Sequence, residues 1–192
     1  MPVASNTLPP RQRILLTAHD LFYREGIRAT GIDRIISESG VAKVTFYRHF
    51  PSKNELIAAF LAYRHEQWLG WFSASLEKHV AQRGDVLLAL IPCFEEWFND
   101  PQYRGCAFIN TAVELAEMLP ESLNIAHQHK KQMAEEIARH LPTGPEQEQR
   151  AEILAMLIDG AIVKVQIEQQ AQHALLLLGE MLKTLATVWN TQ

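Results

Sequence analysis

Apolar and polar residues alternate in the first part of the chain with the period of short helices. The first helical face is apolar at positions three and four residues apart: Ile14, Leu15, Ala18, Leu21 and Phe22. Gly26 follows as the glycine that ends this helix, and Ile27 is placed to pack back against it. The pattern therefore predicts a helix that ends just before Gly26.

Two shorter helices follow. The face of the second helix is traced by four residues: Ile32, Ile35, Ile36 and Ser39. Thr30 is expected to be its N-cap. Gly40 then forms a tight turn into a third helix over about residues 42–50, which ends because Pro51 disfavours helical backbone in the residue before it.

A fourth helix opens directly after Pro51. Ser52 and Glu55 have the S-x-x-E spacing of a capping box. Three short helices joined in this way are typical of a helix-turn-helix, in which the second helix of the pair enters the major groove of DNA. The N-terminal segment is therefore interpreted as a DNA-binding domain.

The third helix separates its residues by face. Ala42, Phe46 and Phe50 recur at four-residue intervals and are expected to pack inward. The opposite face carries residues suited to DNA: Lys43, Val44, Tyr47 and Arg48. Hydroxyl and ammonium groups can reach phosphates, while apolar groups can contact thymine methyls.

The run from Gly40 to Leu56, GVAKVTFYRHFPSKNEL, resembles the signature of the TetR/AcrR family of bacterial transcriptional regulators. The resemblance covers the first third of the chain. It implies an all-helical homodimer that binds a palindromic operator in double-stranded DNA and usually represses. It also implies that a small molecule bound in the C-terminal domain usually releases the DNA.

The resemblance assigns roles to residues in this segment. Tyr47, His49 and Lys53 match phosphate-contacting positions of the family, and Lys43, Val44 and Thr45 match the positions nearest the bases. Two residues depart from the family pattern: Val44, where a glycine is common, and Ala42, where a serine or threonine is usual. The full set of predicted DNA-binding residues is Arg28, Thr30, Lys43, Val44, Thr45, Tyr47, Arg48, His49 and Lys53. An intramolecular ion pair is the alternative for Arg48, and a structural role is the alternative for His49.

The rest of the chain also reads as helices separated by Gly and Pro. The expected helices cover about residues 52–82, from Asp85 to 98, 105–118, 121–140, 146–170 and 172–189. With the first three they make about nine, so the predicted fold class is all-α. We expect a DNA-binding domain at 8–55 and an effector-binding and dimerisation domain at 56–192.

The last two helices are apolar around most of their circumference. A helix of this kind is buried on more than one side, and in a chain of this size the second side is most simply a partner subunit. The predicted homodimer interface comprises Leu154, Leu157, Ile158, Ile162, Leu178, Met181, Leu182, Leu185 and Trp189. The alternative is an unusually buried core in a monomer.

Aromatic residues are dense in the middle helices. An apolar pocket with a few polar groups is the usual form of a ligand site, so these residues predict a hydrophobic or aromatic effector. The predicted pocket residues are Trp68, Phe72, Phe94, Trp97, Phe98, Tyr103, Cys106, Phe108, Asn110 and Gln166. Glu114 is a further possible polar anchor. Core packing is the alternative for each aromatic residue.

Cys106 lies at the start of a predicted helix beside Arg104. Such a position lowers the pKa of a thiol and increases its thiolate fraction. The segment around it also resembles a Gly-Cys stretch of some family members that sense electrophiles or oxidants. Thiol-based sensing is therefore an alternative function, although a buried cysteine usually acts as a small hydrophobic residue.

Charge is distributed unevenly along the chain. Residues 1–55 carry eight Lys and Arg against five Asp and Glu, whereas the whole chain has a net charge of −4. A basic end on an acidic body has the sign expected for a DNA-binding surface confined to that end. Binding without sequence preference would need a more basic domain, so specific recognition is favoured.

Other classes of protein are poorly supported. The chain has no nucleophile elbow, P-loop or dinucleotide fingerprint, and its histidines lack metal-ligand spacing, so we expect neither an enzyme nor a metal or cofactor site. A signal peptide and a membrane-spanning run are also missing, which predicts a cytoplasmic protein. Activation of transcription on the same fold is the remaining alternative to repression.

Overall fold

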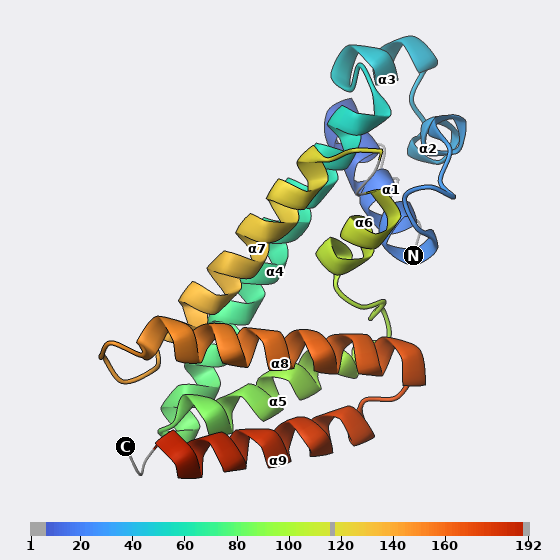
Figure 1. Cartoon of the computed structure of the whole chain (residues 1–192). Coiled ribbons are helices and arrows are strands. Elements are labelled where there is room, and N and C mark those ends of the chain that lie inside the picture. The colour runs from blue at the N-terminus through green and yellow to red at the C-terminus, as the bar shows by residue number, and fades with distance from the viewer. Residues whose placement is uncertain (1–6, 116–117, 190–192) are drawn as a thin grey trace. The chain divides into compact units, whose positions relative to one another are not determined.

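The structure is a computed structural model, and it describes residues 7–115 and 118–189. These residues form helices and connecting loops, as the sequence predicts (Figure 1). The helices are α1 (Pro10–Glu25), α2 (Ile32–Ser39), α3 (Lys43–His49), α4 (Lys53–Arg83), α5 (Val86–Phe98), α6 (Ala107–Leu115), α7 (Glu121–Ala138), α8 (Gln147–Glu168) and α9 (Gln172–Trp189). The all-α fold class and nine helices are thereby confirmed for the part of the chain that the structure describes.

Two compact units divide the described chain. The first unit holds the residues up to Glu66 together with Ala107–Ala126, and the second holds Gln67–Cys106 together with the residues from His127 on. The first unit therefore combines α1, α2, α3 and the beginning of α4 with α6. The predicted boundary between residues 55 and 56 separates a DNA-binding domain from an effector-binding and dimerisation domain. This functional division stays a prediction.

The core of the first unit joins its short helices. Ile14 and Leu21 of α1, Ile35 of α2 and Phe46 of α3 are completely buried. Phe60 of α4 packs edge-on against the ring of Phe22, with ring centroids 5.4 Å apart. Helices as short as α2 and α3 are marginal in isolation, so this shared core is what keeps them folded.

Local sequence signals set the helix boundaries. Gly26 has a φ of 92° and Gly40 a φ of 63°, conformations that are costly for other residues. The Ser52 hydroxyl accepts the N–H of Glu55 at 3.2 Å, as one half of the predicted capping box. Asp85 caps α5 by accepting the N–H of Leu88 at 3.1 Å.

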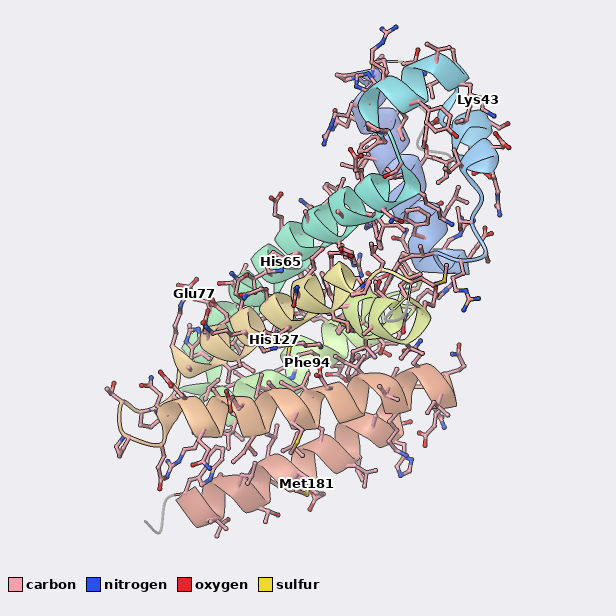
Figure 2. The ribbon with its side chains drawn as sticks, turned by 45° about the horizontal axis from the view of Figure 1, so that its top comes forward. Lys43, His65, Glu77, Phe94, His127 and Met181 are labelled. Atoms are coloured by element: carbon pink, nitrogen blue, oxygen red, sulfur yellow. The ribbon has the colours of Figure 1, made fainter. Side chains whose placement is uncertain are left out.

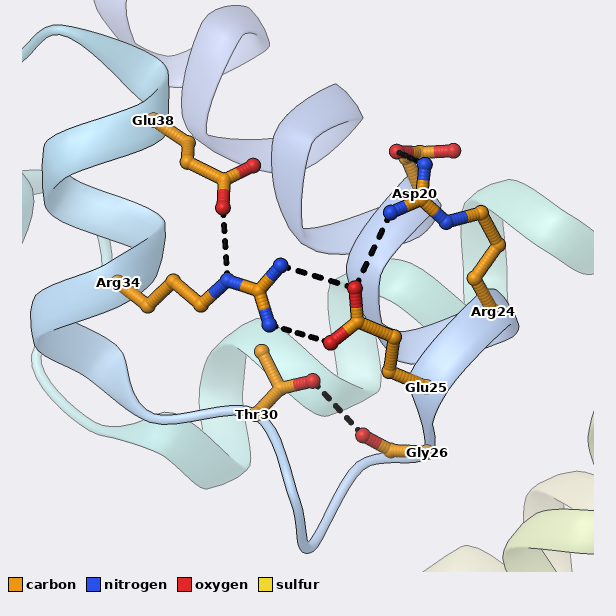
Figure 3. A network of polar contacts seen from close by, with 7 residues as sticks. All are labelled: Asp20, Arg24, Glu25, Gly26, Thr30, Arg34 and Glu38. Atoms are coloured by element: carbon orange, nitrogen blue, oxygen red, sulfur yellow. Dashed lines mark hydrogen bonds and ion pairs between the residues drawn. The ribbon is translucent and has the colours of Figure 1, made fainter.

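The N-cap predicted for α2 is wrong. Gly31 occupies the N-cap position and provides no side-chain cap. The Thr30 hydroxyl instead donates to the carbonyl of Gly26 at 2.8 Å, inside the preceding loop (Figure 3). Threonine favours the N-cap position, but in this loop its hydroxyl binds the carbonyl of Gly26.

An ion-pair network ties α2 to the end of α1. Arg34 donates to both carboxylate oxygens of Glu25 and to Glu38, while Arg24 pairs with Asp20 and Glu25 (Figure 3). The hydrogen bonds from Arg34 and Arg24 lower the pKa of Glu25. Since these side chains are exposed, the network orients α2 more than it stabilises the fold.

In the second unit, α5 and α9 pack together and α9 also packs on α8 (Figure 1). Phe72, Leu76, Leu90, Phe94 and Ile158 are completely buried in this unit. None of the helices in the described ranges combines the length and apolar character that crossing a membrane requires.

His19 is enclosed by aromatic rings in the first unit. Its ring lies 5.3 Å from that of Tyr63 and 5.7 Å from that of Phe60, measured between centroids. Burial lowers the pKa of His19 to about 4, and the charge of Arg64 acts in the same direction.

We expect His19 to make the stability of the protein depend on pH. The imidazole has an ordinary pKa of 6.5 and a folded-state pKa of about 4, so in this range the unfolded chain binds a proton that the folded chain does not. The stabilisation is complete above pH 6.5 and is lost as the pH falls to about 4. Denaturant unfolding of wild type and His19→Gln at pH 7 and pH 4.5 should show the wild type losing about 2 kcal/mol more. The exposed His127, replaced by Gln, is the control, and an equal loss in all three proteins would contradict the assignment.

Candidate DNA-binding surface

Helix α3 presents one apolar face to the core and one mixed face to solvent. Phe46 is completely buried and Phe50, which follows the helix, is 2% exposed. On the other face Val44 is 72% exposed and Tyr47 is 40% exposed. Lys43 and Arg48 are also exposed, whereas Thr45 and His49 are partly buried. The structure thus places four of the predicted contacts of this helix on its outward side, whereas Thr45 and His49 are less exposed.

The turn and the end of α3 are fixed by arginines of α1. Arg13 donates to the carbonyl of Gly40 at 3.4 Å, in the turn between α2 and α3. The guanidinium of Arg11 lies 5.1 Å from the centre of the Phe50 ring. These contacts hold both ends of a helix of seven residues.

Exposed positive charges surround this face. Arg48 makes no ion pair with any residue that the structure describes, so the intramolecular alternative for its side chain has no support. Lys43 pairs with Asp33 at 3.2 Å, but both side chains are strongly exposed and this pair is weak in water. Both cations are therefore available to a polyanion.

Two predicted DNA contacts, Thr30 and Lys53, have structural roles in the loop between α1 and α2. Thr30 is completely buried. The ammonium of Lys53 donates to the carbonyls of Ile27 at 2.6 Å and Thr30 at 2.7 Å, and burial lowers the pKa of this amine. The complete burial of Thr30 contradicts its assignment as a DNA contact, because the motif does not reveal that its hydroxyl binds within the loop. Lys53 is only partly buried, and its phosphate contact stays a prediction. Arg28 remains exposed.

Glu114 belongs to the same region, although its sequence position suggested an effector pocket. Its carboxylate oxygen Oε2 accepts the N–H of Ile27 at 2.9 Å and the N–H of Arg28 at 3.1 Å. The two partners are separated by 87 and 86 residues, so no local pattern could have paired them.

Six predicted effector residues form an aromatic cluster in the second unit. Trp68 stacks on Phe72 with centroids 4.9 Å apart, and Trp97 contacts Trp68, Phe94, Phe98 and Tyr103. The Nε1 atom of Trp68 is buried and has no hydrogen-bond acceptor among the described residues. Phe108 and Asn110 belong to α6 in the first unit. The cluster is tightly packed, and one of its polar atoms is unsatisfied.

The segment before α6 lies against α8 within the second unit, where it meets two polar members of the predicted pocket. The Tyr103 hydroxyl donates to the carbonyl of Ile162 at 2.8 Å. The Gln166 amide lies so close to Gly105 that a Cβ there would be 2.2 Å from its oxygen. Glycine at residue 105 is thus required by close packing as well as by its φ of 84°.

Both thiols are buried. Cys106 is 4% exposed and Cys93 is completely buried. Burial raises the pKa of Cys93 to about 12, which leaves it protonated at neutral pH. The low exposure of Cys106 gives no support to its assignment as a sensor.

The predicted dimer residues separate into two groups. Leu154, Ile158, Ile162, Leu178 and Leu182 are buried within the single chain, so the prediction is corrected for them: they fill the subunit's own core. Leu157, Leu185 and Trp189 are partly buried, and Met181 is 45% exposed. Sequence could not separate the two groups because both are apolar.

Other apolar residues are exposed in two lines. On α8 these are Met156 and, seven and eleven residues later, Val163 and Ile167; on α9 they are Leu177, Met181 and Val188 (Met181 is labelled in Figure 2). Gly160 lies in the line on α8 and Thr184 in the line on α9, so the members of each line are four, three and four residues apart. On α8 this line lies opposite the buried face, so it has no role in the core of the subunit.

The fold and this surface define a helix-turn-helix protein with an attached helical body. The family model of the bacterial regulatory proteins of the tetR family matches residues 14–60. SCO4454 of Streptomyces coelicolor, a TetR-family transcriptional regulator, is similar in structure with a TM-score of 0.74 and 27% identity, covering 91% of this chain and 95% of that one. The sav143 protein of Streptomyces avermitilis is similar with a TM-score of 0.75 and 26% identity, covering 94% and 98%. The chain belongs to the TetR family, as its sequence motif predicts.

Curated relatives match over shorter stretches. The transcriptional activator FasR of Mycolicibacterium smegmatis is 41% identical over 111 residues, which are 56% of this chain. This chain spans about half the length of FasR, 51%. The regulator YerO of Bacillus subtilis is 42% identical over 53 residues, which are 18% of its own length.

We expect both thiols of the native protein to react slowly with an aromatic disulfide reagent. Because Cys93 is buried and protonated and Cys106 is buried, modification in buffer at pH 7 should be at least about 100-fold slower than in denaturant. The variant Cys93→Ser isolates Cys106, and Cys106→Ser isolates Cys93. Rapid modification of native Cys93→Ser would contradict the inference and favour thiol-based sensing.

Proposed function

We propose that the protein is a cytoplasmic, ligand-responsive transcriptional repressor that binds a palindromic DNA operator as a homodimer. The observation that best supports this proposal is the distribution of side chains between the two faces of α3: Phe46 is buried, whereas Val44 and Tyr47 are exposed. A soluble helix gains nothing by exposing these side chains unless they contact a partner. The major groove of DNA admits such a helix and offers thymine methyls and phosphates to it.

Charge supports the same partner. The exposed side chains of Lys43 and Arg48 on α3 and of Arg28 beside α2 can neutralise phosphates. Val44 and Thr45 are the candidates for contact with bases, and Tyr47 and His49 for contact with the backbone. The remaining chain is acidic, which orients the protein with this surface toward the duplex.

A homodimer is supported by the exposed lines on α8 and α9. Apolar residues spaced by four and three residues are typical of helices that pack on partner helices. Two helices from each subunit would form a four-helix interface with two-fold symmetry, and this symmetry matches a palindromic operator.

Response to a ligand is supported by the aromatic cluster in the second unit. The buried Nε1 of Trp68, which has no acceptor among the residues that the structure describes, is a donor that an effector carrying a hydrogen-bond acceptor could satisfy. Helix α4 runs continuously from Lys53 to Arg83, so a shift of this helix on effector binding would change the spacing of the two α3 helices.

Activation is the second candidate for the direction of control. FasR is named a transcriptional activator, and it is 41% identical over its matched residues. The same DNA-binding surface serves either outcome, because the position of the operator relative to the promoter determines the sign.

We predict that Tyr47→Ala weakens operator binding without unfolding the protein. Tyr47 is 40% exposed, so its loss removes a DNA contact and little of the core. The operator dissociation constant should rise about tenfold, which corresponds to about 1.4 kcal/mol, in fluorescence anisotropy at fixed salt. Tyr47→Phe separates the hydroxyl from the ring, and Leu88→Ala, an exposed position in the second unit, is the control. Normal binding by Tyr47→Ala with an unchanged melting temperature would remove Tyr47 from the interface.

We also predict that Met181→Glu dissociates the dimer. A two-fold interface would bring the new carboxylates into an apolar contact, where they lose hydration. Sedimentation should show the dimer dissociation constant raised about 100-fold or more. Lys183→Glu places the same charge on a face of α9 away from the line and should remain dimeric. Equal behaviour of the two variants would contradict this interface.

A further inference from the structure

The loop between α1 and α2 is held by a carboxylate from a distant helix. Glu114 lies on α6, and its oxygen Oε2 accepts the consecutive N–H groups of Ile27 and Arg28 at 2.9 and 3.1 Å. Both the loop and α6 belong to the first unit. Consecutive backbone N–H groups that converge on one oxygen form a small anion-binding site, and here the protein fills it with its own side chain.

The backbone of the loop is shaped to receive this carboxylate. Gly26 has a φ of 92°, and a Cβ at this residue would lie 2.9 Å from the oxygen Oε1 of Glu114. The absence of a side chain at Gly26 therefore leaves room for the carboxylate. Ile27 is 3% exposed, so the same short segment also anchors the loop in the core.

A second charged side chain holds the other side of the loop. The ammonium of Lys53 donates to the carbonyls of Ile27 and Thr30, and the Thr30 hydroxyl donates to that of Gly26. The charge of Glu114 favours the protonated form of Lys53 and thus raises its pKa against the effect of burial. Two N–H groups of the loop are thus bound by Glu114 of α6, and two of its carbonyls by Lys53 of α4.

We propose that Glu114 is a positioning residue for operator binding. By holding Ile27 and Arg28, its carboxylate fixes the loop that leads into α2 and α3, so the affinity of α3 for DNA depends on where α6 holds this group. This inference rests on the proposed function. It adds that a residue outside the helix-turn-helix, with no contact to DNA, sets the geometry of the DNA-binding surface.

The position of α6 makes this dependence useful for regulation. Helix α6 begins at Ala107, directly after the segment that Tyr103 and Gln166 fasten within the second unit. A rearrangement of that segment would be carried along the helix to Glu114 by the covalent chain. A released loop would have to become ordered again before DNA could bind, so the apparent affinity for the operator would fall.

A simple electrostatic role for Glu114 makes the opposite prediction. Removing a negative charge from a DNA-binding protein strengthens its attraction to phosphates. A positioning role predicts weaker binding when the hydrogen bonds are lost, whatever happens to the charge. The sign of the change therefore separates the two roles.

Two mild variants separate charge from geometry. Glu114→Asp keeps the charge but withdraws the carboxylate by about 1.5 Å, whereas Glu114→Gln loses the charge but keeps an acceptor oxygen at the same reach. We expect Glu114→Asp to raise the operator dissociation constant about tenfold and Glu114→Gln to change it less than about threefold. Glu121→Ala, which removes an exposed carboxylate from the same unit, is the control.

The experiment uses the whole chain, residues 1–192, and the operator fragment recovered from genomic DNA. Amide hydrogen exchange of the free protein should be faster at Ile27 and Arg28 in Glu114→Asp than in wild type and Glu114→Gln. The slope of affinity against salt should stay the same in all variants, because no phosphate contact is lost.

Three results would overturn the inference. If Glu114→Asp bound the operator as tightly as wild type does, Glu114 would have no positioning role. The same would follow if Glu114→Gln bound more tightly and its slope of affinity against salt changed by the amount expected for one charge. Unchanged amide exchange in Glu114→Asp would mean that the carboxylate does not hold the loop. Failure of the wild type to bind any specific DNA would instead overturn the proposed function, and the exchange data would still report on the loop.

Discussion

The DNA-binding surface depends on the burial of Phe46. Helix α3 has only seven residues, far fewer than the ~12–15 that an isolated helix needs for stability in water. Its N-cap residue, Ala42, offers no side-chain hydrogen bond, so capping contributes little. Packing of Phe46 against α1 and α2 therefore holds the helix, and the outward direction of Val44 and Tyr47 follows from this inward anchor.

Around this anchor, each connection in the first unit is fixed by a different kind of contact. Arg13 holds the turn at Gly40, Arg34 joins α2 to the end of α1, and Glu114 with Lys53 binds the loop at Ile27. Loops that lack secondary structure need such side chains to satisfy their backbone groups. The candidate DNA-binding helix α3 is thereby held on a framework whose loops are bound by side chains from α1, α4 and α6.

Sequence reasoning was reliable where the signal is local. Helical periodicity predicts the helices, and Gly26 and Gly40 mark the ends of the first two. In α3 the four-residue spacing of apolar residues distinguishes buried Phe46 from exposed Tyr47. The sequence did not predict hydrogen bonds between residues that are far apart along the chain. Lys53 binds loop carbonyls 23 and 26 residues before it, and Glu114 binds a loop 86 residues before it. On α8 and α9, composition showed an excess of apolar residues, but only the fold separated buried Ile158 from exposed Met156.

The proposed function requires that this surface binds a specific DNA sequence and that the protein does so as a dimer. The most direct measurement is selection of genomic DNA fragments by the purified protein at near-physiological salt, followed by sequencing. We predict a small set of fragments that share an inverted repeat, with half-sites about one helical turn apart. Fragments without a common sequence, recovered in proportion to their abundance, would contradict the claim.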